Sequence, residues 1–594
     1  MCGICGEVRF DGSTPDVAAV ARMTDAMVTR GPDSAGAYAR QSVAFGHRRL
    51  CIIDLSARGG QPMVDSELGL SLVFNGCIYN YKELRAELRQ AGYRFFSTAD
   101  SEVVLKSFHR WGADCVHRFK GMFAFAVYEI DSGVVTFARD RLGIKPLYFT
   151  EQPGRLRFAS TVQALLRGGG IDTTIDRVAL HHYLSFAAAV PAPHTMFEGV
   201  RKLPPATVRV VRPDGTSTER CYWEPRFEPS PERASWTPVQ WQQAVMEALR
   251  TAVSRRMVAD VPVGVLLSGG IDSSLLVALL AEQGQRSLPT FSIGFDSAGG
   301  ESGNEYFYSD LVARTFGTDH QQIHIDPSRL PAAVPKTIEA MSEPMLSHDC
   351  VAFYLLSEEV AKSVKVVQSG QGADEILGGY HWYPPLIGVA REQSAEAYAK
   401  VYFDRAHEDI AALLDPEYCL DHDVSWEFVA RHHSAPGADT AVDAALRLDT
   451  TVMLVEDPVK RVDTMTMAWG LEARVPFLDH EFVELAATCP PELKLAGDGK
   501  GVLKEASRGL LPNAVIDRTK GYFPVPGIRH LEGDVLTLVQ DSLRSRSARE
   551  RRLFRPEFLD ALFAAPNEIR TARGVNTLWQ VGLLEMWLQA MERL

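Results

Sequence analysis

The sequence has no run of apolar residues long enough to cross a bilayer and no excess of basic residues. The first absence argues against a membrane protein, because a transmembrane helix needs about 20 consecutive apolar residues. The formal net charge of −13 argues against a nucleic-acid partner, although a local cradle can still bind ATP. No basic and apolar leader opens the chain, so we expect a cytoplasmic protein without a secretion signal.

Cysteine is scarce and odd in number, with nine in 594 residues, which fits a reducing compartment better than a disulfide framework. Cys2 and Cys5 form a C-x-x-C pair, but the chain lacks a second pair of this kind. A zinc site would need that second pair, and a thioredoxin-like motif should begin a helix after a strand. A metal- or redox-binding protein is therefore the outside alternative.

The chain is too long for one ordinary core, so we expect two or more domains. Hydrophobic residues make up 46% and charged residues 23% of it, which is a globular profile. The segment 224–238 is rich in proline and charge and poor in aliphatic residues, as linkers are. We predict a first domain over residues 1–222, a linker over 223–240 and a second domain over 241–594.

The two predicted domains differ in their hydrophobic pattern. Short alternating apolar runs dominate the first, with helical patterns over 16–28, 82–91 and 102–111, and predict an α+β domain with stacked antiparallel sheets. In the second, a helical pattern over 241–258 precedes alternating apolar strands and helices. This alternation predicts an α/β domain with a parallel sheet and a nucleotide site at the carboxyl ends of its strands.

A glycine-rich turn follows the first apolar strand of the second domain, in VGVLLSGGIDSSLL. Gly269 and Gly270 let the backbone approach an anion, and the N–H groups of the next helix point at it. Ser268 and Ser273 add hydroxyl donors, whereas Asp272 would repel phosphate and suits a Mg²⁺ ligand better. The turn matches neither the Walker A nor the dinucleotide G-x-G-x-x-G pattern.

A second stretch, SGQGADEILGGY, also follows an apolar strand. Its backbone at Ser369 and Gly370 supplies more donors, and Asp374 supplies a second acid. Two acids from two strand ends suit a Mg²⁺ ion that carries pyrophosphate oxygens. Asp374 also suits a helix N-terminus, and the two roles are compatible.

With a nucleotide-binding domain downstream, a cysteine directly after the first methionine gains a chemical meaning. Once Met1 is removed, the α-amino group of Cys2 can act as the base for its own thiol. The thiolate can then attack a carboxamide and release ammonia. Asn75 and Gly76 follow the strand LSLVF and offer a side-chain amide and a backbone N–H to the oxyanion.

The stretch SGGIDSS resembles the signature of the ATP pyrophosphatases, whose domain is of the adenine-nucleotide α-hydrolase-like type. The motifs MCGICG, RGPDSAG, HRRLCIIDL, NGCIYN, GMFAFAVYE and ARDRLGIKPLYF resemble the N-terminal-nucleophile (Ntn) glutaminase domain of class II amidotransferases. Joined to SGQGADE and MAWGLEARVPFLDH, nearly the whole chain resembles glutamine-hydrolysing asparagine synthetases. The resemblance implies glutamine, ATP and a carboxylate acceptor as small-molecule substrates, with Mg²⁺ as a cofactor. A homodimer is left open.

The same resemblance implies roles for individual residues. Cys2 is the nucleophile and Lys520, in DRTKGYF, stabilises charge on the α-phosphate. Glutamine is bound by Arg49 at its carboxylate and by Asp100 near its amino group, with further contacts from Asn75 and Gly76. The implied ATP contacts are Leu267, Ser268, Gly269, Gly270, Asp272, Ser273, Ile293, Ser369 and Gly370, and the implied metal ligands are Asp272 and Asp374. Arg474 and Asp479 in EARVPFLD suit structural ion pairs and are left out of the catalytic set.

Two positions depart from asparagine synthetases. Cys77 in NGCIYN replaces an acid, which removes one expected contact to the glutamine amino group and leaves that contact to Asp100. Gln371 in SGQGADE also replaces an acid, and we place it in the acceptor pocket. An amide only donates and accepts hydrogen bonds, so Gln371 suits an acceptor without a free ammonium group better than it suits aspartate.

The stretches NGCIYN, LSFAAAVPAPHT, VVQSGQGADEILGGYHWYPP and RTKGYFPVPG resemble the N-acetylglutaminylglutamine amidotransferases. This resemblance implies amidation of the C-terminal carboxylate of an acetylated dipeptide in osmoprotectant biosynthesis, with release of glutamate, AMP and pyrophosphate. The aromatic residues of HWYPP either line the acceptor pocket or pack in the core.

Other functions remain compatible with parts of this pattern. An asparagine synthetase would take aspartate as its acceptor. A cyclase of the β-lactam-synthetase type would keep the fold without a glutaminase, which the retained Cys2 argues against. A non-catalytic regulator would not need Cys2, SGGIDSS and Lys520 together.

Overall fold

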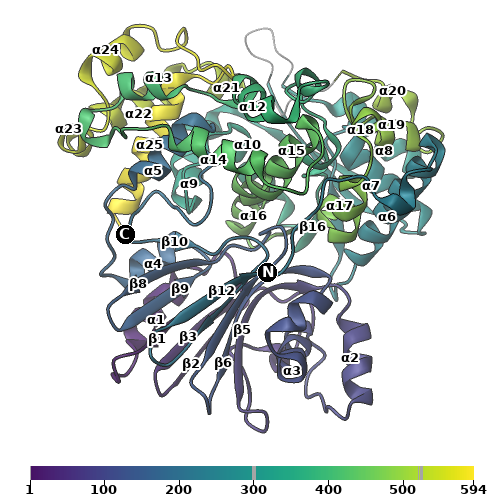
Figure 1. Cartoon of the computed structure of the whole chain (residues 1–594), viewed down its shortest axis with the longest axis vertical. Coiled ribbons are helices and arrows are strands. Elements are labelled where there is room, and N and C mark those ends of the chain that lie inside the picture. The colour runs from purple at the N-terminus through teal and green to yellow at the C-terminus, as the bar shows by residue number, and fades with distance from the viewer. Residues whose placement is uncertain (1, 297–302, 520, 522–525) are drawn as a thin grey trace.

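The computed structural model describes residues 2–296, 303–519, 521 and 526–594. Antiparallel sheets form one half of the molecule, and a parallel sheet with many helices forms the other (Figure 1). This arrangement confirms the predicted fold class. Within the described residues, no helix combines the length and apolarity needed to cross a membrane.

The first half contains two stacked antiparallel sheets of six strands each. In spatial order, the first sheet consists of β10 (Arg201–Lys202), β8 (Tyr148–Gln152), β9 (Arg155–Ala159), β1 (Gly3–Arg9), β3 (Val43–Arg49) and β2 (Ser34–Arg40). The second consists of β12 (Ser217–Cys221), β11 (Thr207–Val211), β7 (Val135–Arg139), β6 (Gly121–Glu129), β5 (Leu70–Ile78) and β4 (Met63–Asp65).

Helices cover the outer faces of these sheets (Figure 1). Helices α1 (Val17–Asp25) and α4 (Val162–Gly168) lie on the first sheet, and α3 (Asp100–Trp111), with α2 (Tyr81–Gln90) beside it, lies on β5. Because strand side chains alternate, Val73 of β5 packs between the sheets, and Asn75 lies on the same face of the strand. The alternation of side chains along β5 therefore directs Asn75 into the layer between the two sheets, near the start of β1.

The second half contains a parallel sheet of five strands. In spatial order these are β15 (Asp319–Ile325), β14 (Pro289–Phe295), β13 (Val263–Leu266), β16 (Val366–Gln368) and β17 (Glu472–Arg474). The strand order reverses between β13 and β16, and such a point is where open parallel sheets bind ligands. Both predicted cradle stretches begin there, since SGGIDSS follows β13 and SGQGADE follows β16.

The helices that position the second half follow recognisable local signals. Helix α6 (Pro238–Arg255) begins with a capping box from Thr237 and Gln240, so its first turn lies inside the predicted linker. Helix α7 (Ile271–Glu282) is apolar all round because it packs beneath the sheet. Other helices used below are α5 (Arg177–Ser185), α8 (Tyr306–Phe316), α9 (Leu330–Ala340), α10 (Asp349–Val360), α11 (Ala373–Leu377), α13 (His407–Leu413), α14 (Val424–Ser434), α16 (Lys460–Met467), α17 (His480–Ala487) and α25 (Thr577–Glu592).

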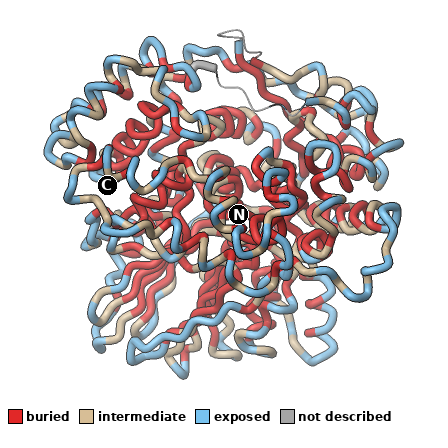
Figure 2. The backbone as a smooth tube through the Cα atoms, turned by 45° about the horizontal axis from the view of Figure 1, so that its top comes forward, coloured by how far each residue is buried: buried red, intermediate tan, exposed pale blue. Residues whose placement is uncertain are grey.

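The hydrophobic core is continuous across the two halves. One cluster includes Phe123 of the second antiparallel sheet, Val265 of the parallel sheet and Phe477 near its far edge. Figure 2 shows the buried backbone running from the sheets into the helical half, with exposed positions at the periphery. The two halves therefore pack as one body, which brings residues distant in sequence into contact at their interface.

Candidate active sites

The predicted nucleophile lies between the two antiparallel sheets. The backbone N–H of Cys2, just before β1, donates to Asn75 Oδ1 of β5 at 3.0 Å. Burial raises the pKa of the Cys2 thiol, while the backbone N–H of Leu50 and the charge of Arg49 act in the opposite direction. The structure therefore brings together Cys2, Asn75 and Arg49 from three different strands or strand ends.

Asn75 and Gly76 have the environment expected of oxyanion donors. Asn75 is fully buried, and its Nδ2 has no hydrogen-bond partner among the described residues. A buried amide N–H₂ without a partner is costly unless a ligand satisfies it. Gly76 is packed so tightly against β6 that a Cβ atom would lie 2.2 Å from the Met122 carbonyl oxygen. Only glycine fits this position of the strand.

The two predicted glutamine ligands lie near Cys2 and Asn75. Arg49, at the end of β3, donates to the carbonyl oxygens of Asp54 and Ser56, the latter at 2.7 Å, so the following loop holds its guanidinium in place. Asp100, the first residue of α3, accepts from the Ile78 N–H at 3.0 Å. Burial raises the pKa of the Asp100 carboxyl to about 6.

Cys77 is directed at the other half of the molecule. Its Sγ lies 3.7 Å from Arg474 Nη2, and Arg474 also forms a buried ion pair with Glu472 at 2.6 Å between Nε and Oε1. Arg474 and Glu472 belong to β17, the edge strand that the sequence did not reveal. The expected structural ion pairs are present, because Asp479 pairs with Arg256 at 2.9 Å. A strand of the synthetase half thus reaches the glutaminase pocket.

The two cradle loops pack directly on each other. Within the first loop, the hydroxyls of Ser268 and Ser273 lie 3.0 Å apart, and Gly269 has a φ of +74°. A Cβ atom on Gly370 would lie 3.0 Å from the Asp272 Cβ and the Ser273 N–H. The positive φ of the turn favours glycine at position 269, and the close approach of the loops leaves little room for a side chain at position 370.

The two predicted metal ligands converge as expected, and a lysine lies between them. Lys500 Nζ is 2.7 Å from Asp272 Oδ2 and 2.8 Å from Asp374 Oδ1. Burial alone would lower the Lys500 pKa, but the two carboxylates raise it above its ordinary value. The sequence analysis missed Lys500, although the glycines around it in GDGKG were a signal of a backbone turn close to a ligand.

A cavity of about 1340 Å³ opens at this end of the parallel sheet. It is lined by every predicted nucleotide, acceptor and metal residue of the cradle except Gly269: Leu267, Ser268, Gly270, Asp272, Ser273, Ile293, Ser369, Gly370, Gln371 and Asp374. Lys500 also lines it, whereas Lys520 lies outside the described residues. The structure therefore brings the two cradle stretches and β14 around one space.

The cavity extends into a region rich in aromatic side chains. The rings of Tyr380 and Trp382 stack at 4.1 Å, and the Arg573 guanidinium lies 5.0 Å from the Trp382 ring and 4.6 Å from the Tyr402 ring. Two neighbouring residues of the HWYPP stretch differ in their environment. Trp382 lines the cavity, whereas Tyr383 is fully buried and its hydroxyl donates to Asp449 at 2.6 Å. No sequence signal linked Arg573 to this place.

Both halves of the chain match known protein families. Residues 1–223 match the family described as glutamine amidotransferase domain, and residues 244–589 match asparagine synthase. Asparagine synthetase [glutamine-hydrolyzing] 1 of Bacillus subtilis is 33% identical over 86% of this chain and 84% of its own length. Asparagine synthetase [glutamine-hydrolyzing] 3 of the same organism is 30% identical over 88% and 87%. The putative asparagine synthetase of Mycobacterium bovis is 33% identical over 89% and 88%.

The matched regions coincide with the two halves seen in the structure. The first carries the Cys2 pocket and the second carries the nucleotide cradle. Members of the asparagine synthase family use ATP. The chain belongs to the asparagine synthetase family and is a glutamine-hydrolysing carbon–nitrogen ligase.

Proposed function

We propose that this ligase amidates the C-terminal carboxylate of N-acetylglutaminylglutamine, in osmoprotectant biosynthesis. It would act in the cytoplasm, with residues 1–222 as the glutaminase, 223–240 as the linker and 241–594 as the synthetase. All nine cysteines lie within the described residues and none is in a disulfide, which suits a reducing compartment.

The observation that carries the proposal is the size and lining of the catalytic cavity. Small-ligand pockets usually measure about 300–1000 Å³, so a cavity of about 1340 Å³ has room for a nucleotide and a second, extended ligand. Aspartate would leave the aromatic region unfilled. Tyr380, Trp382 and Tyr402 line the cavity and give a peptide a surface to lie against, and the Arg573 guanidinium, which also lines it, suits the carbonyl oxygens of the peptide.

Gln371 supports the same acceptor. It lies in the cradle loop between Gly370 and Gly372, beside Asp374, and lines the cavity. An acid at this position could bind an α-ammonium group, as aspartate requires, whereas an amide pairs better with a neutral acceptor. An N-acetylated dipeptide has no free ammonium group.

In the glutaminase half, the Cys2 thiolate would attack the side-chain carboxamide carbon of glutamine. Its α-amino group, free once Met1 is removed, accepts the thiol proton and returns it to the departing ammonia. Asn75 Nδ2 and the Gly76 N–H would stabilise the oxyanion, while Arg49 and Asp100 hold the carboxylate and ammonium of the substrate. Water then cleaves the thioester to glutamate and frees Cys2.

In the synthetase half, the acceptor carboxylate would attack the α-phosphorus of ATP and displace pyrophosphate. Lys520 would stabilise charge at the α-phosphate. Asp272 and Asp374 would hold Mg²⁺, which neutralises phosphate charge when bound; they fit it because their carboxylates already converge on one cation, the Lys500 ammonium. Ammonia would then attack the acyl carbon and displace AMP.

We further propose that ammonia passes through the interface between the halves. A cavity of about 300 Å³ lies there, lined by Arg30, Tyr148 and Lys202 of the first half and by Glu343, Lys460 and Asp463 of the second. Arg30 donates to the Cys2 carbonyl oxygen at 3.4 Å and to Asp463 Oδ2 at 3.0 Å, so it joins the glutaminase pocket to this cavity. A path inside the protein would keep water from the acyl-adenylate.

The test is acceptor-dependent AMP release with ATP, Mg²⁺ and glutamine, with products identified by mass. N-acetylglutaminylglutamine should support turnover and aspartate should not. The matched variant Gln371→Glu should lose activity with the dipeptide by about tenfold or more. Turnover with aspartate alone would overturn the proposal.

Asparagine synthetase is the second candidate function. The names of the relatives favour it, since the three described above are all called asparagine synthetases. The same assay separates the two functions, because aspartate would then yield asparagine and AMP in equal amounts. In that case Gln371 would have to accept a substrate with a free ammonium group, and Gln371→Glu should preserve or raise activity.

A further inference from the structure

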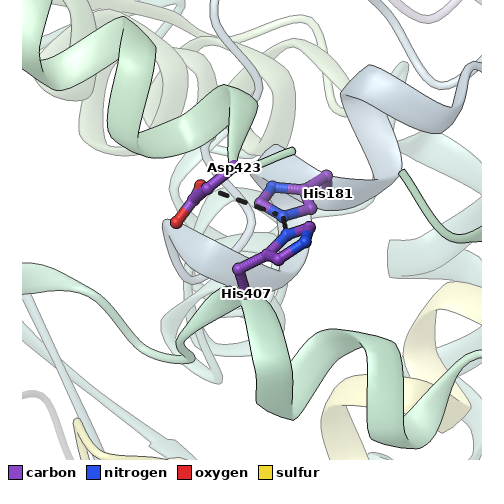
Figure 3. Close-up of side chains that lie close together, drawn as sticks. All are labelled: His181, His407 and Asp423. Atoms are coloured by element: carbon purple, nitrogen blue, oxygen red, sulfur yellow. Dashed lines mark hydrogen bonds and ion pairs between the residues drawn. The ribbon is translucent and has the colours of Figure 1, made fainter. Parts of the chain in front are cut away.

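Away from the catalytic cavity, three side chains that can bind a metal meet from three separate segments (Figure 3). His181 lies on α5, His407 is the first residue of α13, and Asp423 is the N-cap residue of α14. His181 Nε2 is 3.0 Å from His407 Nδ1 and 3.9 Å from Asp423 Oδ1. One ligand atom of each residue lies within 4.8 Å of the other two.

The buried histidine of this cluster is held in the orientation that a metal ligand needs. Ser425 Oγ lies 2.8 Å from His181 Nδ1, which leaves Nε2 directed at His407 and Asp423. A hydrogen bond at the second ring nitrogen is the usual way in which proteins orient a ligating histidine.

The cluster is open to solvent on one side. His407 and Asp423 are half-buried and line a surface cavity of about 730 Å³. Glu408 and Asp409 line the same cavity. An ion can therefore reach the cluster from solvent, and water or one of these acids can supply a further ligand.

We propose that His181, His407 and Asp423 form a zinc site. Zinc binds imidazole nitrogen at about 2.0–2.1 Å and carboxylate oxygen at about 2.0–2.2 Å, usually in a tetrahedron. Ligand atoms of such a site are about 3.4 Å apart, and the separations of 3.0 and 3.9 Å lie on either side of this value. The ion would replace the hydrogen bond between the two imidazoles.

The site is structural, because no predicted catalytic residue belongs to it. It would tie α5, which continues the glutaminase half, to α13 and α14 of the synthetase half. Helix α5 leads directly into Phe186 and Ala187, which line the catalytic cavity. Zinc would therefore fix one wall of that cavity without taking part in the reaction.

The experiment is calorimetric titration of the full, untagged chain with Zn²⁺ after removal of metals by a chelator. Two conservative variants test the ligands. Asp423→Asn keeps a good N-cap residue and removes the charge, and His407→Gln replaces a half-buried imidazole by an amide. The control is His324→Ala, which removes an exposed histidine that also faces a carboxylate, Asp296, at 3.1 Å.

We expect one equivalent of Zn²⁺ to bind the native chain and the His324→Ala variant with equal affinity. Asp423→Asn and His407→Gln should each weaken binding at least tenfold. Zn²⁺ should raise the melting temperature of the native chain but not of these two variants, and Co²⁺ should give tetrahedral absorption bands only with the intact cluster. Zinc binding that is absent, or unchanged in both variants, would overturn the proposal, as would a site that takes Fe²⁺ and rejects Zn²⁺.

Discussion

The pocket around Cys2 and the nucleotide cradle are held in shape by different means. Strand backbone positions the first, since Asn75 lies within β5 and a glycine is required beside it by the contact with β6. Two loops and three charged side chains form the second, where Lys500 bridges Asp272 and Asp374. The first site has an unpaired donor among the described residues, whereas the carboxylates of the second already have a counter-charge.

The difference follows from the charge of the ligands. A neutral carboxamide develops one negative charge during the reaction. Fixed amide dipoles in a rigid strand are enough to stabilise that charge, and they need no counter-charge before the substrate binds. ATP brings several negative charges, and the proposed Mg²⁺ ion would bring two positive ones. Carboxylates without a counter-charge would destabilise a partly closed cavity. An ammonium group of the protein therefore offsets their charge when no ligand is bound. The cradle must therefore rearrange when its ligands bind, and the Cys2 pocket need not.

The broadest effect should follow from Asp272→Asn, which tests whether the cradle serves both nitrogen sources. Losing a metal ligand removes about 4 kcal/mol of transition-state stabilisation, or about a thousandfold in rate. Amide synthesis should fall equally with glutamine and with ammonium salt, as measured by AMP release, while glutaminase activity persists. Normal AMP release would remove Asp272 from the metal site.

Cys2→Ala is the converse test, because it removes the predicted glutaminase nucleophile and leaves the cradle intact. Glutamine hydrolysis should fall by at least about a thousandfold, because the nucleophile is lost. Synthesis from added ammonium salt should continue at the native rate, since the cradle is untouched. An equal fall in ammonia-driven synthesis would show that Cys2 is not simply the glutaminase nucleophile.

Asn75→Ala sharpens the claim that the Cys2 pocket is pre-organised. Removing one oxyanion donor usually lowers kcat by about 100- to 1000-fold. The KM for glutamine should change little, because the interaction forms mainly in the transition state. A raised KM with an unchanged kcat would instead assign Asn75 to ground-state binding.

The pH dependence of glutamine binding tests Asp100. Its carboxyl has a pKa of about 6, so it carries a charge above that pH and loses the charge as pH falls. The KM for glutamine should therefore rise, by about tenfold, as pH is lowered through 6, because the ammonium group loses its partner. Asp100→Asn should give the high KM at every pH between 5 and 8. A native KM that stays flat across this range would contradict the role.

Lys500→Asn should have the smallest effect. It tests whether the Lys500 ammonium group offsets the charge of the two cradle acids when no ligand is bound. Asparagine tolerates the positive φ of +55° at this position. The two acids, each about one-fifth exposed, would lose the Lys500 ammonium group, at a cost of about 2 kcal/mol. The melting temperature should fall, and Mg²⁺ should restore part of the loss in the variant only. No response to Mg²⁺ would mean that the acids do not share an ion.

Much of the fold and of both sites could be predicted from neighbouring residues in the chain. The runs VPVGVLL and VKVVQ predicted buried parallel strands, and the carboxyl ends of parallel strands meet at one edge of a sheet. This rule alone brought Asp272 close to Asp374. The short strand β17 escaped prediction because two of its three residues, Glu472 and Arg474, are charged, so it shows no apolar run.

The contacts that could not be predicted from the sequence join distant parts of the chain. Lys500 reaches Asp272 across 228 positions, and Arg474 reaches Cys77 across 397. The cluster proposed to bind zinc likewise joins His181 to His407 across 226 positions. None of these contacts leaves a local pattern in the sequence.

The sequence by itself determined the two kinds of domain and the position of the glycine-rich cradle, and it predicted the Cys2 chemistry. Hydrophobic periods, glycine turns and helix starts depend on a few adjacent residues, so they can be read without the fold. Only the tertiary structure decided that Tyr383 packs in the core while Trp382 lines the cavity, and that Arg573 lies over that ring. These placements depend on how helices hundreds of residues apart pack together, which no local preference specifies.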